Sequence, residues 1–373
     1  MPPSPLRLLI VLPSWVGDLV MATPALRLIR DELPGSLVGA LCRGGAEEIL
    51  AGTDLIDQFE LRREGMMGPK RTAGALRPHR YGAALLLSNS LSTALTCRLS
   101  GVPIRLGYDR DGRGSLLTHG LAAPRREARG RSGGKWAVVP AAAYYHHAAR
   151  ALLEVLRDGS MTAPDVDDRG EPLIAALPAG ARLELAVTES QRRAADEILE
   201  RAGASDEPFA ILNPGGNKLA KRWPPERFAR LADDLHERGL RVLINGAPAE
   251  AELVREIAGL ARTDPVDLTA LGGTLGALKG VVARARIMVT GDTGPRHFAA
   301  ALGTPVVTLF GPTDHRWTTI PAPGGEEIVL ACEDLPGDDL ANDHPERCRV
   351  DRIGYEVVLG AVDRLLGQDS GRG

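Results

Sequence analysis

The chain has 373 residues, of which 44% are hydrophobic and 25% charged, and its formal net charge at pH 7 is −3. These proportions are typical of a globular protein with a substantial core, and the length favours two domains. No apolar run approaches the roughly 20 residues of a transmembrane helix. The N-terminus lacks the plan of a signal peptide, and the four cysteines are too scattered for a disulfide framework. We therefore expect a cytoplasmic protein.

Positive charge is concentrated in the first half of the chain. Residues 1–150 contain 20 Lys and Arg against 12 Asp and Glu, and residues 61–135 contain 15 against 4. Such an asymmetry favours an anionic partner for this half, either a nucleic acid or a phosphorylated membrane surface. A solvated basic face without a partner is the alternative.

Short apolar runs alternate with helix-like segments in the first half, which predicts a parallel sheet of βαβ units. The expected strands are 6–12, 37–41, 56–61, 83–87 and 104–106. The expected helices are 18–32, 91–99 and 141–157. We expect the Arg- and Gly-rich stretch 109–134 to be a mobile loop, and the Asp-, Gly- and Pro-rich stretch 158–180 to be a linker.

The second half repeats the alternation. Its expected strands are 209–212, 241–244, 266–268, 287–290 and 306–310. Its expected helices are 224–238, 249–261, 274–285, 295–302 and 355–366. The fold class predicted is α/β, with two doubly wound Rossmann-like domains whose sheets direct their carboxyl ends to a ligand-binding cleft.

A glycine turn followed by cations is the most informative stretch of the chain. The strand expected at 209–212 ends in Asn213-Pro214-Gly215-Gly216, where adjacent glycines allow a ligand to approach the backbone. Lys218, Lys221 and Arg222 follow before a helix start at Pro224. The combination predicts a phosphate or pyrophosphate site. An ordinary basic βα connection is the alternative, because no Walker-type or G-x-G-x-x-G motif occurs here.

The first strand is also followed by a loop that contains a candidate catalytic residue, Pro13-Ser-Trp-Val-Gly-Asp18. An aspartate near a helix N-terminus usually caps the helix, which contributes about 0.5–2 kcal/mol. A carboxylate at the carboxyl edge of a sheet is equally placed to act as a general base. The local sequence leaves both roles open for Asp18.

A third loop, Thr290 to His297, follows the strand expected at 287–290. Gly294 and Pro295 mark a turn into a helix, so its amide N–H groups would face the cleft. Asp292 would lie at the strand end and His297 one turn into the helix. The alternative is that Asp292 caps the helix and His297 packs beside it.

Together these motifs resemble those of the ADP-heptose:lipopolysaccharide heptosyltransferases, glycosyltransferase family 9, and of their heptosyltransferase II branch in particular. The resemblance implies GT-B architecture and an inverting, metal-independent transfer without a cofactor. The matching stretches span nearly the whole chain: Ser14-Trp-Val-Gly-Asp18, Pro214 to Pro224, Asn245-Gly-Ala-Pro-Ala-Glu250, Asp292-Thr-Gly-Pro-Arg-His297 and Phe310-Gly-Pro-Thr-Asp314.

The resemblance also implies roles for individual residues. Asp18 would be the base that deprotonates the acceptor hydroxyl, and Lys221 would contact the donor phosphates. Glu250 would hold the ribose, while Asp292, Thr293 and Gly294 would hold the donor sugar and pyrophosphate, with His297 beside them. The anion-site argument adds Gly215, Gly216 and Arg222 to the donor-binding set.

The basic first half would bind an anionic glycolipid acceptor, by resemblance a lipopolysaccharide core precursor at the inner face of the membrane. We expect a monomer. We expect no nucleic-acid partner, because the basic loop lacks the interleaved aromatic residues of a base-stacking surface. The cations expected to bind the acceptor are Arg125, Arg126, Arg129, Arg131 and Lys135.

The expected domains are an acceptor-binding domain (1–180), a donor-binding domain (181–350) and a C-terminal helix and tail (351–373). Arg296 departs from the family pattern and would add a cation beside the phosphate. Cys332, His344 and Cys348 fit no standard zinc spacing, so we expect no metal. The rival functions are a nucleotide-sugar 2-epimerase and a non-catalytic nucleotide-sugar-binding protein.

Overall fold

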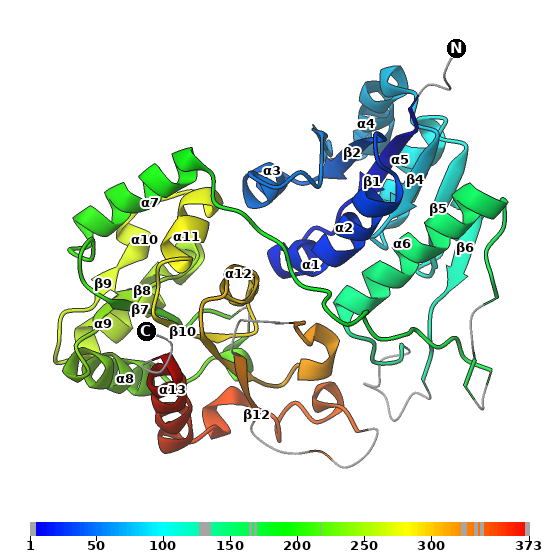
Figure 1. Ribbon diagram of the computed structural model, residues 1–373. Coiled ribbons are helices and arrows are strands. Elements are labelled where there is room, and N and C mark those ends of the chain that lie inside the picture. The colour runs from blue at the N-terminus through cyan, green and yellow to red at the C-terminus, as the bar shows by residue number, and fades with distance from the viewer. Residues whose placement is uncertain are drawn as a thin grey trace. The chain divides into compact units, whose positions relative to one another are not determined.

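The structure, a computed structural model, describes residues 5–126, 136–163, 166–167, 170–216, 218–321, 327–331, 335 and 339–369. These residues form two compact units, one ending at Glu184 and the other beginning at Leu185. Each unit is built on a six-stranded sheet with helices packed against it (Figure 1). The predicted α/β fold class, with two doubly wound units, is confirmed.

The sheet of the first unit has the strand order β3-β2-β1-β4-β5-β6, and every neighbouring pair is parallel. Its central strands are buried on both faces, which explains why they appear as continuous apolar runs. The strands are β1 (Arg7–Val11), β2 (Leu37–Cys42), β3 (Gln58–Leu61), β4 (Ala83–Leu86), β5 (Ile104–Asp109) and β6 (His119–Ala122).

Helices cover both faces of this sheet: α2 packs on α6, and α4 packs on α5. The helix predicted at 18–32 is two helices, because Pro24 lies in the first turn of a new helix. The helices are α1 (Val16–Met21), α2 (Thr23–Glu32), α3 (Ala46–Leu50), α4 (Gly68–Leu76), α5 (Leu91–Leu99) and α6 (Ala141–Asp158).

The stretch 109–134, predicted to be a loop, contains regular secondary structure in its first part. Strand β6 pairs with β5, and the short helix η2 (Gly114–Leu116) lies between them. Arg113 is fully buried, where its Nε donates to the carbonyl of Tyr108 at 2.9 Å and its Nη2 to Asn89 Oδ1 at 3.0 Å. These bonds anchor Arg113 to β5 and to the loop after β4; residues 127–134 lie outside the described part.

The sheet of the second unit has the order β12-β11-β10-β7-β8-β9, again with parallel neighbours. Its strands match the predicted ones closely, except that β12 was not predicted. They are β7 (Phe209–Asn213), β8 (Arg241–Ile244), β9 (Val266–Asp267), β10 (Ile287–Gly291), β11 (Val306–Phe310) and β12 (Glu327–Ala331).

In this unit α7 packs on α11, α8 packs on α9, and α13 lies against β10 and β11. Trp223 is the largest fully buried side chain; it stacks on Tyr355 and donates to the carbonyl of Ile353 at 2.9 Å. The helices are α7 (Glu189–Arg201), α8 (Pro225–Glu237), α9 (Ala251–Leu260), α10 (Leu268–Leu271), α11 (Leu275–Val282), α12 (Gly294–Leu302) and α13 (Tyr355–Asp369).

Both sheets therefore have the 3-2-1-4-5-6 order of a Rossmann fold when each is numbered from its own first strand. In this order the connections leave in opposite directions from two adjacent central strands, β1 and β4 in one unit and β7 and β10 in the other. Ligands of such folds bind at this point, outside the carboxyl ends of the strands. The loops that carry Asp18 and Asp292 both lie at such positions.

The end of the first unit is fixed to α2. Arg27 donates to both carboxylate oxygens of Glu184, from Nε at 2.9 Å and from Nη2 at 2.5 Å. The amide of Glu184 also donates to Thr23 Oγ1 at 2.9 Å. Among the described residues, none of the helices has the length and apolar character needed to cross a membrane.

Candidate active site

Asn213 joins the ends of three strands at the switch point of the second unit. Its side-chain amide donates to Thr290 Oγ1 at 3.2 Å and to Thr293 Oγ1 at 3.0 Å. Its oxygen accepts from Asn245 Nδ2 at 2.5 Å. Asn213 and Thr290 are almost completely buried. This polar network fixes the loops that follow β7, β8 and β10 relative to one another.

The glycine turn is shaped by Glu250, at the end of helix η4 (Pro248–Glu250). Its carboxylate accepts from the amides of Gly216 at 2.8 Å and Ala247 at 2.9 Å. A Cβ at Gly215 would collide with this carboxylate, so a larger residue there would displace the Glu250 side chain from its present position. One prediction needs correction: the Gly216 amide, expected to face a phosphate, donates to Glu250 in this structure.

Lys221 and Asp292 come from different loops and meet at the switch point. Lys221 ends helix η3 (Leu219–Lys221), and its Nζ lies 3.9 Å from Asp292 Oδ2. Both side chains are largely shielded from solvent, with 20% and 15% exposed, whereas Lys218 is exposed. Arg222 turns back, and its Nε donates to the carbonyl of Gly216 at 2.8 Å. Lys221 is therefore the cation of this stretch that the fold aims at the loop after β10.

Asp292 does not cap α12, so this part of the alternative is wrong. The residue before the helix is Thr293, and no side chain caps the N-terminus among the described residues. Asp292 Oδ1 instead accepts from Thr318 Oγ1 at 3.4 Å. The amides of the first turn of α12, which begins at Gly294, thus lie beside Lys221 and Asp292 without a side-chain acceptor, as an anion site requires.

Arg296 is not the additional phosphate-binding cation that its position in the sequence suggests. Its side chain is 1% exposed, and its Nε and Nη2 donate to the two oxygens of Glu327 at 2.6 and 3.0 Å. Its Nη1 donates to Thr318 Oγ1 at 3.0 Å and lies 3.7 Å from Asp292 Oδ1. Glu327 on β12 therefore neutralises Arg296. Arg296 in turn contacts the carboxylate of Asp292.

Asp18 lies in the first turn of α1 but does not cap it. The helix is preceded by Trp15, and no side chain caps it among the described residues. Asp18 Oδ1 accepts instead from the hydroxyl of Tyr145 on α6, at 3.1 Å. Burial, together with the Asp18 carboxylate, raises the pKa of Tyr145 well above its usual range, so the hydroxyl stays a donor. The capping alternative is wrong, and no local signal could have revealed a partner so distant in the sequence.

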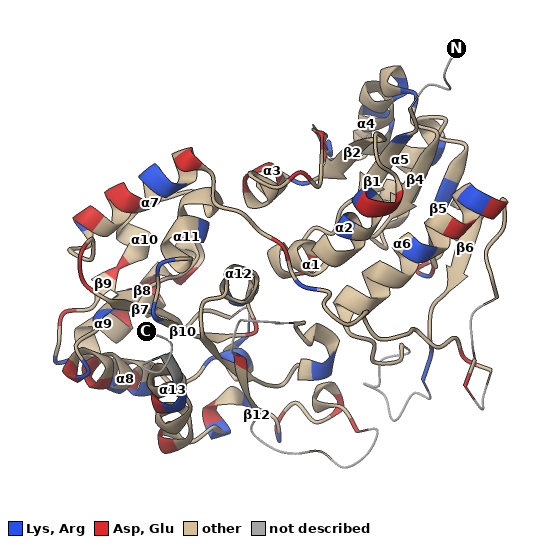
Figure 2. Cartoon of the chain, viewed as in Figure 1, with Lys and Arg blue, Asp and Glu red and all other residues tan. Residues whose placement is uncertain are grey.

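Of the predicted acceptor-binding cations, Arg125 and Arg126 are described; Arg129, Arg131 and Lys135 lie outside the described residues. Arg125 stacks on the indole of Trp136, with its guanidinium 5.5 Å from the ring centre. Arg110, which follows β5, approaches the same ring at 4.3 Å. Figure 2 marks Lys and Arg in blue throughout both units. Arg110 was not among the cations predicted to bind the acceptor, because its contact with Trp136 joins residues that are distant in the sequence.

Comparison with known proteins supports the assignment suggested by this geometry. The family model described as glycosyltransferase family 9 (heptosyltransferase) matches residues 174–339. Lipopolysaccharide heptosyltransferase 2 of Salmonella typhimurium is 26% identical over 322 residues, which cover 84% of this chain and 85% of that protein. Its Escherichia coli counterpart is 27% identical over 323 residues, with the same coverage. Residues 174–339 therefore resemble glycosyltransferase family 9, and lipopolysaccharide heptosyltransferases are similar to the chain over 84% of its length.

Solved structures give the same architecture for this glycosyltransferase. The Escherichia coli structure titled ADP-heptose lps heptosyltransferase II has a TM-score of 0.74 and 23% identity, covering 98% of this chain and all of that one. A family 9 glycosyltransferase from Veillonella parvula has a TM-score of 0.75 and 21% identity, with 99% of each chain covered. The GT-B fold predicted from the motifs is confirmed.

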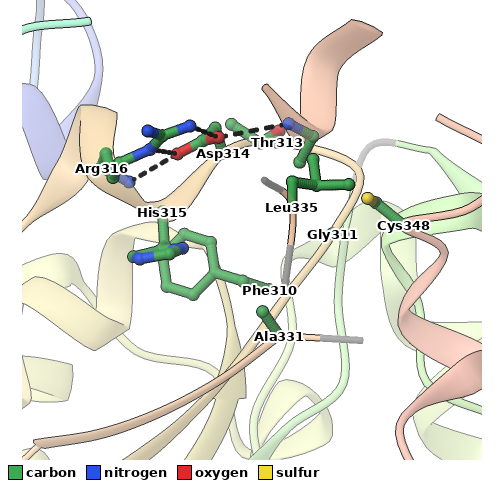
Figure 3. Close-up of a pocket in the computed structure, with 10 residues that line it drawn as sticks. Phe310, Gly311, Thr313, Asp314, His315, Arg316, Ala331, Leu335 and Cys348 are labelled. Atoms are coloured by element: carbon green, nitrogen blue, oxygen red, sulfur yellow. Dashed lines mark hydrogen bonds and ion pairs between the residues drawn. The ribbon is translucent and has the colours of Figure 1, made fainter. Parts of the chain in front are cut away.

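The Phe310–Asp314 motif of the enzyme lines a cavity of about 180 Å³ at the ends of β11 and β12 (Figure 3). Asp314 is buried there; its carboxylate accepts from Arg316 Nε and Nη2, each at 2.9 Å. The residues assigned to the donor do not line this cavity. Among the described residues no cluster of His, Cys, Asp and Glu could hold a metal, while Cys332 lies outside them.

His297 lies in the first turn of α12 and is almost completely buried. Its Nδ1 has no hydrogen-bond partner among the described residues. Burial, reinforced by the charge of Arg296, lowers the pKa of His297 well below its ordinary value of 6.5. The imidazole is therefore neutral when the enzyme is folded at neutral pH.

This shift predicts an acid-sensitive fold. Between the lowered pKa and 6.5 the unfolded chain binds a proton at His297 that the folded enzyme does not, so stability falls as the pH drops below 6.5. The contribution of one such group is at most about 1.4 kcal/mol per pH unit. Urea unfolding at pH values on both sides of 6.5 should show a weaker pH dependence for His297→Gln than for the wild type. Parallel pH profiles would contradict the assignment.

Proposed function

We propose that this enzyme transfers a heptose from a nucleoside-diphosphate heptose to a lipopolysaccharide core-type acceptor, with inversion at the transferred carbon. ADP-heptose is the donor suggested by the names of the relatives. The observation that carries the proposal is the meeting of Lys221 and Asp292 beside the uncapped start of α12. A cation and a helix N-terminus at a topological switch point form a site for a diphosphate.

The donor would lie on the second unit. Lys221 and the amides at Thr293 and Gly294 would stabilise negative charge on the departing diphosphate, with Arg222 holding the glycine turn in shape. Removing one preorganised donor of this kind typically costs about 2.7–4 kcal/mol. Glu250 would accept from the ribose hydroxyls, and His297 would support the helix start. Protein cations and amides supply the charge stabilisation, so the proposal needs no metal ion and no cofactor.

The acceptor would lie on the first unit. Its hydroxyl oxygen would form a bond to the anomeric carbon on the face opposite the diphosphate. The bond from that carbon to the diphosphate oxygen would break, and its electron pair would leave with the diphosphate. The hydroxyl proton would pass to Asp18, whose other oxygen is held by Tyr145. Because the new bond forms on the face opposite the bond that breaks, the configuration at the anomeric carbon is inverted, and Asp18 acts as the general base.

The same proposal assigns residues 1–180 to the acceptor, 181–350 to the donor, and 351–373 to a closing helix and tail. The five cations of the basic loop, Arg125, Arg126, Arg129, Arg131 and Lys135, would bind the anionic acceptor. We further propose that the enzyme works as a monomer at the inner face of the membrane and binds no nucleic acid.

A transfer assay tests the proposal. ADP-heptose should raise the melting temperature of the purified enzyme, and it should be consumed only when a lipopolysaccharide core acceptor is present. Consumption without an acceptor would favour the epimerase alternative. Binding without consumption under any condition would favour a non-catalytic protein.

The donor site predicts different effects for two nearby lysines. Lys221→Ala should weaken ADP binding by roughly 10- to 100-fold, because a hydrogen bond to a charged group contributes about 1.5–3 kcal/mol. Lys218→Ala removes the same charge from an exposed position and should change affinity much less. Titration calorimetry with ADP measures both. Equal losses for the two variants would mean that general charge, rather than the position of Lys221, binds the diphosphate.

A further inference from the structure

The connection between β3 and α4 exposes large apolar side chains. Met66 is 98% exposed, while Met67 and Leu61 are each 48% exposed. Exposure of a single apolar residue is common, but three within seven residues form a small hydrophobic projection. Gly65, in the left-handed backbone region with φ of +84°, turns the chain just before the two methionines.

Cations surround this projection. Residues 61–80 contain Glu64 as their one acidic residue, and Arg43 Nη2 neutralises it at 3.1 Å. Arg63, Lys70 and Arg71 are exposed beside the methionines, and Arg62 is half-buried. The segment therefore combines exposed thioether and alkyl groups with uncompensated positive charge, as the interfacial anchors of peripheral membrane proteins do.

The projection lies at the edge of the sheet that also carries Asp18. Strands β1, β3 and β4 belong to one parallel sheet, so the loops that follow them leave from the same edge. Two further exposed apolar residues lie at this edge, Trp15 at 74% and Leu91 at 52%. Apolar and basic groups thus gather where the proposed base would meet a lipid-linked acceptor.

We propose that residues 61–71 dock the enzyme on an anionic phospholipid bilayer, with Met66 and Met67 in the interfacial region and the cations over the headgroups. A bilayer fits better than a protein partner, because the exposed methionines are flanked by four cations and by a single acidic residue, Glu64, which is paired with Arg43. The inference rests on the proposed function in one respect only, the lipid-linked nature of the acceptor. Docking would present that acceptor to the edge that holds Asp18.

Vesicle binding by the full chain tests the docking. The wild-type enzyme should sediment with vesicles of phosphatidylcholine and phosphatidylglycerol, and much less with phosphatidylcholine alone. Met66→Ser/Met67→Ser should lower the partition coefficient by about tenfold or more, because two apolar side chains leave the interface. Arg63→Gln and Lys70→Gln should each lower it by roughly fivefold at low salt. The matched control is Leu260→Ser/Val357→Ser, which removes two side chains exposed at 48% and 56% on the other unit.

Transfer assays separate this inference from the proposed function. The methionine variant should transfer sugar to a lipid-free core oligosaccharide at the wild-type rate, and more slowly to an acceptor embedded in vesicles. Failure of the wild-type enzyme to bind anionic vesicles, or equal binding by the methionine variant, would overturn the docking. Absence of transfer to either acceptor by the wild type would overturn the proposed function, while the vesicle result would still stand.

Discussion

Replacing Asp18 by asparagine should reduce turnover by about 10²–10⁴, the usual contribution of a general base. The asparagine keeps the size of the side chain and one oxygen that can accept from Tyr145, which lies 3.1 Å away in the wild type. It cannot take a proton from the acceptor hydroxyl. Donor affinity should be nearly unchanged, because the proposed donor residues all belong to the second unit. Steady-state transfer rates and ADP titration measure the two quantities separately.

Asp31→Asn is the matched control for this variant. Asp31 lies in the last turn of α2, its side chain is 63% exposed, and its ion pair with Arg27 is 3.7 Å long. Surface pairs of this kind contribute about 0–1 kcal/mol, so the control should transfer sugar normally. Wild-type turnover in Asp18→Asn would leave Asp18 as a structural partner of Tyr145, and the base would have to be another group.

Replacing Glu327 by alanine should destabilise the second unit by about 3–5 kcal/mol, the usual cost of leaving one charge of a buried pair without its partner. Arg296 is 1% exposed and would lose both of its charge-assisted bonds to the carboxylate. Its remaining acidic neighbour is Asp292, 3.7 Å away. We expect Arg296 to shift towards Asp292 and compete with Lys221, so ADP affinity should fall as well.

Two further variants identify the cause of that loss. Arg296→Met/Glu327→Leu removes both charges together, and it should recover most of the stability lost in Glu327→Ala. Glu356→Ala breaks an exposed pair with Arg230, 3.0 Å long, and should cost about 1 kcal/mol or less. Denaturant unfolding measures all three variants. A double variant as unstable as the single one would show that packing, rather than unpaired charge, explains the effect.

The strands could be predicted from the sequence because most of them are buried on both faces. Strands β8 and β11 are found at the predicted residues. Strand β6, His119–Ala122, was missed because only Leu121 of its four residues is buried, so it lacks an apolar run. Its conformation comes from edge pairing with β5, a tertiary contact that local propensity does not report. The Arg and Gly content of that stretch indicated a loop, which left the strand unpredicted.

The site was predictable as three loops but not as a set of contacts. The loop positions followed from strand ends and glycine turns, and the structure brings Lys221 and Asp292 together. The partner of Arg296 is Glu327 on β12, 31 residues away. The residues adjacent to Arg296 in the sequence therefore gave no indication that its charge is neutralised within the fold. The same holds for the hydroxyl of Tyr145, which reaches Asp18 across 127 positions.

The attachment of Glu184 to Arg27 and Thr23 has a mechanical consequence. On the other side, α7 begins with a capping box, in which Thr188 Oγ1 accepts from the Gln191 amide and the Gln191 side chain accepts from the Thr188 amide. The covalent link between these two fixed ends is residues 185–187, each with two soft backbone dihedral angles. The torsional freedom of the backbone between Glu184 and Thr188 therefore resides in these three residues. Proline there would restrict this freedom, while the contacts of both sites would be unchanged.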